Sequence, residues 1–192
     1  MNILRKIIFG PAALLMLLLA VPGVFYAQSA PSCPADFKPV EYADLSLCSG
    51  KWYEIARYPN FFQKNLVGGT AVWTNLENGG IHVLFSGRKH CLDGKEITSS
   101  LKGWIVDKQS NSVFRVMFFW PFSGKYWVVA AGRNYEYAVI SKHSRSHLWI
   151  MCRKPEMDEK TYDAVLKQLE AQGFDLSKLV KVPQEVVQKP IR

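Results

Sequence analysis

The sequence predicts an all-β protein: an eight-stranded antiparallel up-and-down β-barrel with one C-terminal α-helix packed outside it. Three observations support this prediction. Between residues 51 and 153, segments rich in Val, Ile, Phe, Tyr, Trp and Thr recur at a spacing of about ten residues. Two of the intervening turns contain dipeptides that favour tight hairpins. After Pro155 the hydrophobic period changes to that of a helix.

Hairpin turns connect the predicted strands. Asn78-Gly79 and Asp93-Gly94 both suit the positive φ of a tight turn, so the strands that they join are antiparallel. A closed barrel is favoured over a two-sheet sandwich because closure leaves no strand edge unpaired. The predicted strands span residues 51–58, 66–77, 80–90, 95–107, 112–120, 125–131, 135–142 and 147–153.

One amphipathic helix follows the strands. Asp158 is a suitable N-cap and Gly173 a suitable stop. The apolar residues between them recur at helical spacing, which predicts that one face packs against the outside of the sheet. This face comprises Tyr162, Val165, Leu166 and Leu169.

The N-terminal residues 1–29 have the order of a secretory signal peptide. Arg5 and Lys6 supply its positive start, and an apolar run to Phe25 precedes small residues. An uncleaved membrane anchor is the alternative, although Gly and Pro interrupt the run. Cleavage predicts a secreted or periplasmic protein, and association with the outer membrane is compatible with that location.

The remaining chain reads as one domain with short flanking segments. An N-terminal arm covers residues 30–47, the barrel with its helix covers 48–182, and a C-terminal tail covers 183–192. The formal net charge of +8 falls to +6 when the two basic residues of the leader are removed. The basic residues are scattered singly, and this pattern argues against nucleic acid as a partner.

Four cysteines lie beyond the leader, so disulfides are expected in an exported protein. Three pairings are open. Cys48 and Cys152 are preferred, because they lie next to the first and last strands near one end of a closed barrel, and Cys33 would then pair with Cys91. Alternatively, Cys33 is lipidated at the N-terminus, or Cys91 is a free nucleophile.

Successive connections of an up-and-down barrel alternate between its two ends. One end therefore collects residues 50–53, 133–135 and Arg153. The opposite end, the mouth, collects loops 59–65, 91–94, 120–124 and 142–147. Segments far apart in the sequence are thus predicted to meet.

Three of these segments resemble the signatures of the lipocalin family. They are Gly50-Lys51-Trp52-Tyr53, continued as Glu-Ile-Ala-Arg-Tyr, then Arg133-Asn134-Tyr135-Glu-Tyr-Ala, and finally Leu148-Trp-Ile-Met-Cys-Arg153. From about Leu45 to Val180 the chain is most similar to the group of bacterial lipocalins and apolipoprotein D. It departs from the group where Arg-Asn-Tyr replaces the common Thr-Asp-Tyr, and its leader lacks a good lipoprotein cleavage sequence.

The resemblance implies that one end of the barrel is closed by structural residues. Gly50 lets the chain pass tightly beneath the barrel, and Trp52 fills the floor. Arg153 is expected to lie over that ring as a cation–π partner and to donate hydrogen bonds to nearby carbonyls. The structural set comprises Gly50, Trp52, Arg133, Tyr135 and Arg153.

The family register also implies a cavity lined by apolar side chains. Alternation along the strands adds Ile81, Val83, Phe114 and Val116 to the inward set. Lys89 is the polar exception and would orient a head group, as would Tyr126, unless the lysine instead leans out into water. The implied ligand-binding residues are Trp73, Phe85, Lys89, Phe118, Tyr126 and Trp149.

These inferences predict a protein that binds, stores or transports a small hydrophobic ligand, such as a fatty acid or lysophospholipid. No catalytic residue, cofactor or metal is expected, since His90, Cys91, His143 and His147 lack the spacing of a metal site. An enzyme using the Cys91 thiol is one alternative. Another is a protein-interaction module that acts through the rim loops around Phe61 and Trp120, which would otherwise form a lid or contact a membrane. The oligomeric state is predicted to be a monomer or homodimer.

Overall fold

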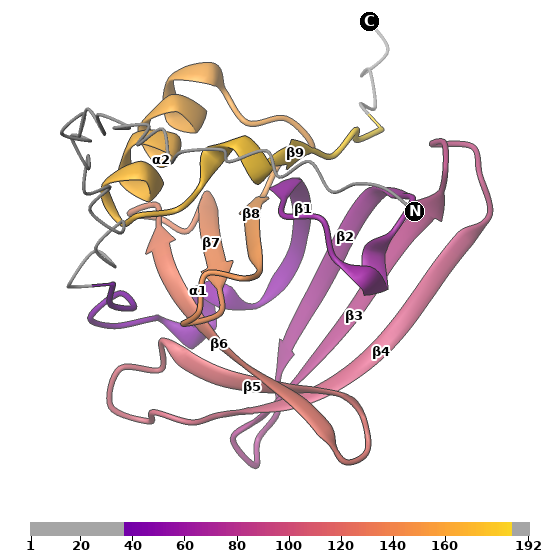
Figure 1. Cartoon of the computed structure of the whole chain (residues 1–192). Coiled ribbons are helices and arrows are strands. Elements are labelled where there is room, and N and C mark those ends of the chain that lie inside the picture. The colour runs from indigo at the N-terminus through magenta and orange to yellow at the C-terminus, as the bar shows by residue number, and fades with distance from the viewer. Residues whose placement is uncertain (1–36, 186–192) are drawn as a thin grey trace, which may run out of the picture. The chain divides into compact units, whose positions relative to one another are not determined.

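The computed structural model describes residues 37–185 (Figure 1). The predicted signal peptide, Cys33 and residues 186–192 lie outside the described residues. Among residues 37–185, no helix is both long and apolar enough to cross a membrane.

Eight antiparallel strands form a closed barrel, which confirms the predicted fold (Figure 1). Each strand pairs with the next along the chain from β2 to β8, and β1 closes the sheet by pairing with both β8 and β2. The strands are β1 Gly50–Arg57, β2 Leu66–Asn75, β3 Gly80–Lys89, β4 Glu96–Ile105, β5 Val113–Phe119, β6 Phe122–Ala131, β7 Tyr137–Ser141 and β8 Leu148–Cys152.

The two closing strands stay paired over only half of their length. β1 and β2 pair from Gly50↔Trp73 to Tyr53↔Thr70. Beyond that point both strands contain a register shift, and the short strand β9 (Val180–Lys181) pairs with the end of β1. The β1–β2 seam is therefore open toward the mouth and is occupied by the C-terminal segment.

This segment continues past the predicted domain end. The Gly68 amide donates a hydrogen bond of 2.8 Å to the Pro183 carbonyl. The Gln184 side chain donates to the carbonyls of Glu54 and Gly69 at 2.6 and 3.0 Å. Residues 183 and 184, expected in a trailing tail, thus satisfy backbone groups that the seam leaves without a ladder partner.

One of the two predicted hairpin turns has different backbone geometry. Gly79 adopts the expected positive φ of 78°. In the β3–β4 turn the positive φ, 67°, falls on His90, and Gly94 has none, so that part of the turn prediction is wrong. The His90 amide donates to the Asn65 carbonyl at 2.7 Å, which ties this turn to the neighbouring mouth loop.

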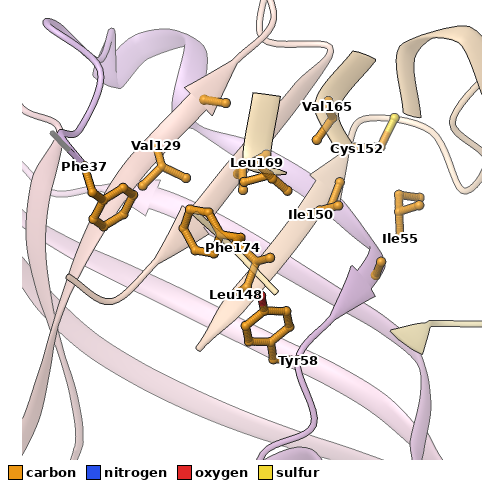
Figure 2. Packing of buried hydrophobic residues seen from close by; sticks show 13 residues of the cluster. Phe37, Ile55, Tyr58, Val129, Leu148, Ile150, Cys152, Val165, Leu169 and Phe174 are labelled. Atoms are coloured by element: carbon orange, nitrogen blue, oxygen red, sulfur yellow. The ribbon is translucent and has the colours of Figure 1, made fainter. Parts of the chain in front are cut away.

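The C-terminal helix α2 spans Glu159–Ala171 and begins and ends as predicted. The Asp158 side chain accepts a hydrogen bond of 2.9 Å from the Thr161 amide, and Gly173 has a φ of 76°, which favours glycine. Val165 and Leu169 are buried against the outer face of the barrel (Figure 2). The residues of this outer core are Phe37, Ile55, Ala56, Tyr58, Val129, Ala130, Val139, Leu148, Ile150, Cys152, Val165, Leu169 and Phe174.

The end of the N-terminal arm is part of the fold. The Phe37 ring stacks on Trp127 and meets Phe174 edge-on, with ring centroids 5.2 Å apart in both pairs. The short helix α1 (Leu45–Cys48) follows, with Asp44 as its N-cap. The arm thereby leads the chain to the closed end of the barrel, where β1 starts.

The packing of α2 yields a stability prediction. We expect Leu169→Ala to lower the free energy of unfolding by about 2–5 kcal/mol, because this side chain is fully buried and its removal leaves a cavity. Urea denaturation checks the loss, with the neighbouring exposed Glu170→Ala as the control. Equal midpoints for the two variants would show that α2 does not stabilise the barrel.

Candidate functional site

The closed end of the barrel is organised around one arginine. The Arg153 guanidinium carbon lies 3.6 Å from the centroid of the Trp52 ring. Its nitrogens also donate to backbone carbonyls of the segment that enters β1, at 2.9 Å to Lys51 and 2.8 Å to Ser49, and also to Leu47. One cation therefore covers the floor tryptophan and binds the chain on which that tryptophan is carried.

The other predicted closed-end residues have different environments. Gly50 has a φ of 97°, and a Cβ there would lie 3.4 Å from Arg153. The Tyr135 hydroxyl accepts a hydrogen bond of 2.7 Å from the Asp44 amide, and its ring packs with Trp52. Arg133 is exposed and, within residues 37–185, makes no hydrogen bond, ion pair or ring contact. The floor is thus built without the guanidinium of Arg133.

The preferred disulfide between Cys48 and Cys152 is not formed, and both thiols are free. Met151 lines the barrel interior, so the alternation along β8 turns Cys152 outward beneath α2. Cys48 packs on the inner side with the floor residues. Burial raises the pKa of the Cys48 thiol to about 11, against a smaller opposing effect of Arg153, so this thiol stays protonated at neutral pH. A Cys33–Cys91 bond remains a prediction, since Cys33 is outside the described residues.

Above the floor the barrel encloses a cavity of about 510 Å³. Five of the six predicted ligand-binding side chains line it: Trp73, Phe85, Phe118, Tyr126 and Trp149. Further aliphatic and aromatic residues on alternate strand positions complete the wall, among them Val83, Leu101, Phe114, Val116, Val128 and Ile140. The volume falls within the range of about 300–1,000 Å³ typical of small-molecule pockets.

Aromatic rings form a continuous path from the floor of this cavity to its mouth. Ring centroids are 5.0 Å apart between Trp73 and Phe114, 6.0 Å between Phe114 and Tyr126, and 6.2 Å between Tyr126 and Phe118. At the mouth the Phe62 ring stacks on Phe118 at 4.9 Å with an interplanar angle of 4°. An apolar ligand would contact rings along the whole depth.

The sixth predicted residue, Lys89, lies elsewhere. It is exposed at the mouth end of β3 and is not part of the cavity wall. Another lysine takes a position beside the cavity: the Lys142 ammonium lies 5.8 Å from the centroid of the Tyr126 ring. His147, in the same loop, lines the cavity, and burial together with Lys142 lowers its pKa, so its imidazole is neutral at neutral pH. His147 was expected at the mouth, but neither it nor Lys142 was among the predicted ligand-binding residues.

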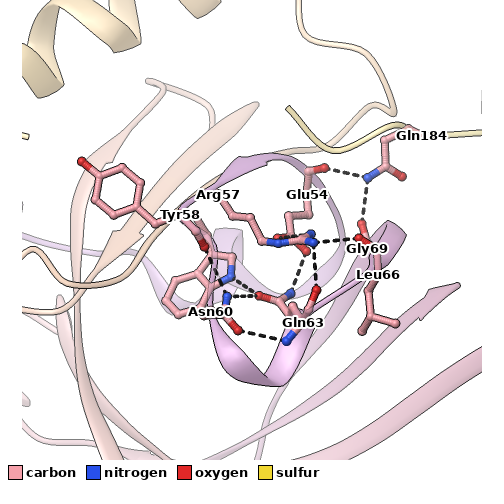
Figure 3. A network of polar contacts seen from close by, with 9 residues as sticks. Glu54, Arg57, Tyr58, Asn60, Gln63, Leu66, Gly69 and Gln184 are labelled. Atoms are coloured by element: carbon pink, nitrogen blue, oxygen red, sulfur yellow. Dashed lines mark hydrogen bonds and ion pairs between the residues drawn. The ribbon is translucent and has the colours of Figure 1, made fainter. Parts of the chain in front are cut away.

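A buried polar network attaches the first mouth loop to the barrel (Figure 3). Glu54 is fully buried on β1, and Arg57 donates to one of its carboxylate oxygens at 3.1 Å. Gln63, in the 3-10 turn Phe61–Gln63, donates to the other oxygen at 2.8 Å. The Gln63 side-chain carbonyl accepts from Asn60 and from the Trp149 indole, both at 2.7 Å.

Backbone carbonyls accept the remaining hydrogen bonds of the network. Arg57 also donates to the carbonyls of Gln63 and Leu66 at 3.0 and 2.7 Å. Gly69 is required nearby, because a Cβ there would collide with the Glu54 carboxylate. Burial raises the pKa of Glu54, while Arg57 and then Gln63 act in the opposite direction. The carboxylate is expected to be ionised at neutral pH. Both of its oxygens accept hydrogen bonds from N–H groups, and neither of these nitrogens could accept a hydrogen bond from a protonated carboxyl group.

The remaining reactive side chains do not gather at the cavity. Cys91 is exposed in the β3–β4 turn and is not part of the cavity wall. A hydrogen bond with Asp93 and a smaller effect of burial raise the pKa of its thiol. In the described part of the chain, no three His, Cys, Asp or Glu side chains come close enough together to hold a metal ion.

Comparisons with known proteins agree with this geometry. Residues 43–184 match the family model described as a lipocalin-like domain. The chain is 35% identical over 147 residues to temperature-induced lipocalin-1 of Arabidopsis thaliana, covering 70% of this chain and 76% of that protein. It is 32% identical over 173 residues to the outer membrane lipoprotein Blc of Escherichia coli K12, covering 89% and 97%. The solved structure of insecticyanin from Manduca sexta superimposes with a TM-score of 0.63 at 22% identity, covering 78% and 85%, which shows the shared fold.

The floor gives one prediction. Arg153→Ala should lower the free energy of unfolding by about 2 kcal/mol, because it removes the cation over Trp52 and leaves carbonyls of the β1 entry without their donor. Arg133→Ala removes a cation from the same end and should change stability by less than about 0.5 kcal/mol. Chemical denaturation measures both. If the two variants lost equal stability, the arginine over the tryptophan would have no special role.

A second prediction concerns the polar network at the mouth. We expect Glu54→Gln to lower the free energy of unfolding by about 1–3 kcal/mol, because the new amide group places an N–H donor opposite the N–H donor of Gln63 or Arg57. The Trp149 fluorescence should change as well, because Gln63 also holds the indole N–H. The exposed Glu77→Gln is the charge-matched control. Wild-type stability and fluorescence in Glu54→Gln would contradict the assigned bonding pattern.

Proposed function

This chain belongs to the lipocalin family, whose members generally bind small hydrophobic ligands, and on that premise we propose that it binds a single-chain lipid such as a fatty acid or lysophospholipid. The observation that carries the proposal is the cavity of about 510 Å³ with its continuous path of aromatic rings. Transfer of apolar ligand surface from water to such a wall is favourable by about 25 cal/mol per Å². Binding therefore needs no chemical step.

The ligand enters acyl chain first in this proposal. The floor side is closed by Trp52 under Arg153, whereas polar side chains of the cavity wall at the mouth include Asn60, Gln63 and His147. Asn60 and Gln63 are held by the mouth network, so they are fixed before a ligand arrives. An apolar tail at the floor and a polar head at the mouth match this distribution.

The head group would contact Tyr126 and Lys142. Within the described chain the Tyr126 hydroxyl has no hydrogen-bond partner, and burial raises its pKa to about 12, so the hydroxyl remains able to donate. The Lys142 ammonium over the same ring adds a positive charge suited to a carboxylate or phosphate. This assignment replaces Lys89 with Lys142 as the cation of the site.

The compartment is proposed on separate grounds. The order of residues 1–29 is that of a secretory leader, and the Blc relatives are named as outer membrane lipoproteins. An extracytoplasmic protein that stores or transports lipid fits both facts. The oligomeric state, monomer or homodimer, stays a prediction.

Two neighbouring residues of β3 test whether the ligand lies inside the barrel. Val83 lines the cavity, while Leu84 is 39% exposed on the outer face. We expect Val83→Trp to weaken binding of oleate by at least about tenfold, because the new ring fills the cavity, and Leu84→Trp to leave it unchanged. Native mass spectrometry counts the bound oleate. If wild type binds neither oleate nor lysophosphatidylethanolamine, or if Val83→Trp binds as wild type does, the proposal is wrong.

The head-group assignment has its own test. Lys142→Met should weaken oleate binding by about tenfold while binding of uncharged monoolein is retained, because only the carboxylate needs the cation. Lys89→Met is the matched control and should bind both lipids like wild type. Isothermal titration calorimetry gives the four affinities. A selective loss in Lys89→Met instead would restore the original assignment.

A further inference from the structure

Four aromatic side chains stand out at the mouth because they are exposed. Phe61 is 88% exposed and Trp120 is 84% exposed, the two highest values among the large hydrophobic residues of the described chain. Phe62 and Phe122 are 56% and 60% exposed. These four residues, here called the aromatic rim, come from the β1–β2 loop and the β5–β6 turn. Such a concentration of exposed rings marks a contact surface.

The rim is continuous with the cavity. Phe62 lines the cavity wall and stacks on Phe118, while its other neighbour is Phe61, with ring centroids 5.9 Å apart. Phe118 is the second-last residue of β5, Trp120 lies in the turn that follows, and Phe122 begins β6. An apolar molecule that moves from the rim to the floor would thus stay in contact with aromatic rings throughout.

The polar network at the mouth fixes the part of the rim that comes from the β1–β2 loop. Gln63 follows Phe61 and Phe62 in the same 3-10 turn and is buried in the network with Glu54 and Trp149. The bonded turn therefore holds Phe61 out in solvent and Phe62 at the edge of the cavity, where it stacks on Phe118.

Positive charge surrounds the aromatic rim. The mouth loops 59–65, 91–94, 120–124 and 142–147, taken together with the adjoining Lys95 and Glu96, contain four Lys or Arg residues and two acidic residues, Asp93 and Glu96. The Arg145 side chain is engaged by the Gln172 carbonyl. The other three, Lys64, Lys95 and Lys142, have no ion-pair partner within residues 37–185. Exposed aromatic rings with unpaired lysines beside them suit an interface of apolar chains beneath anionic head groups.

We propose that the aromatic rim docks the barrel mouth-down on an anionic phospholipid bilayer, with the rings among the upper acyl chains and the lysines at the head groups. The rim would then act as a peripheral anchor. This inference goes beyond ligand binding. It rests on the proposed function in one respect: docking would let the lipid pass directly between the bilayer and the cavity.

The test is flotation, with lipid vesicles, of the purified chain from Ala30 onward, which retains all of the described residues 37–185. Wild type should float with vesicles of phosphatidylglycerol and phosphatidylethanolamine but not with phosphatidylcholine alone, and about 0.5 M salt should weaken its binding. The rim variant Phe61→Ser/Trp120→Ser should partition at least about tenfold less. The control variant Leu76→Ser/Trp104→Ser removes exposed apolar residues toward the closed end and should float as wild type does.

Oleate binding by native mass spectrometry on all three proteins separates this inference from the proposed function. Retention of oleate by the rim variant, with loss of flotation, supports docking through the rim. Wild type that binds oleate but never floats would overturn the docking and leave the proposed function intact. Equal flotation of the rim variant and wild type would also overturn it. A third outcome would also overturn the docking: wild type is a dimer that does not bind vesicles, and the rim variant is a monomer. The rim would then be a protein interface.

Discussion

The structure depends on the closure of the sheet by β1. This strand pairs with β8 along one edge and with β2 along the other, so it joins the first and last parts of the barrel. The pairing turns Trp52 inward, where it forms the floor, and Arg153 from the end of β8 lies on its ring. Strand closure and floor therefore stabilise each other, because the residues that cover the floor belong to the strands that close it.

The partial pairing of β1 with β2 explains why charged groups are buried in this protein. Beyond Tyr53 the two strands separate, and backbone groups and space become available in the seam. Glu54 and Arg57 fill it together with Gln63, and Gln184 satisfies carbonyls from outside (Figure 3). Burial of an ion pair is a costly way to stabilise a fold. Here the pair serves to attach the mouth loop in a defined position above an apolar cavity.

The two ends of the barrel thus differ in chemistry. At the floor, carbonyl oxygens converge on one arginine, which lies over the Trp52 ring. At the mouth, polar side chains are turned inward to bind each other, whereas Phe61 of the same loop is turned outward into solvent. This difference between the two ends is the observation on which both proposals rest.

Much of the architecture could be predicted from the sequence because it depends on local patterns. Alternation gave the strands, the N-cap Asp158 and Gly173 bounded the helix, and hairpin parity brought Trp52 and Arg153 together. The same alternation, applied to β8 from Trp149, would have placed Cys152 outside, away from Cys48. Five of the six predicted ligand-binding residues lie in the wall for the same reason.

Only the tertiary structure decided the rest. The register shifts lie in the pairing of β1 with β8 and of β2 with β3; Gly68-Gly69 marks the second as an irregular strand position, but which residues meet there depends on the closed barrel. The bond from Trp149 to Gln63 spans 86 residues and that from Gln184 to Glu54 spans 130, so the mouth network has no local sequence pattern. The place of Lys142 rather than Lys89 beside the cavity was likewise set by how the strand ends and loops fold over the mouth. The sequence by itself determined which faces of the strands are apolar, whereas the folded barrel determined which polar groups meet, because that depends on distances between segments that only closure brings together.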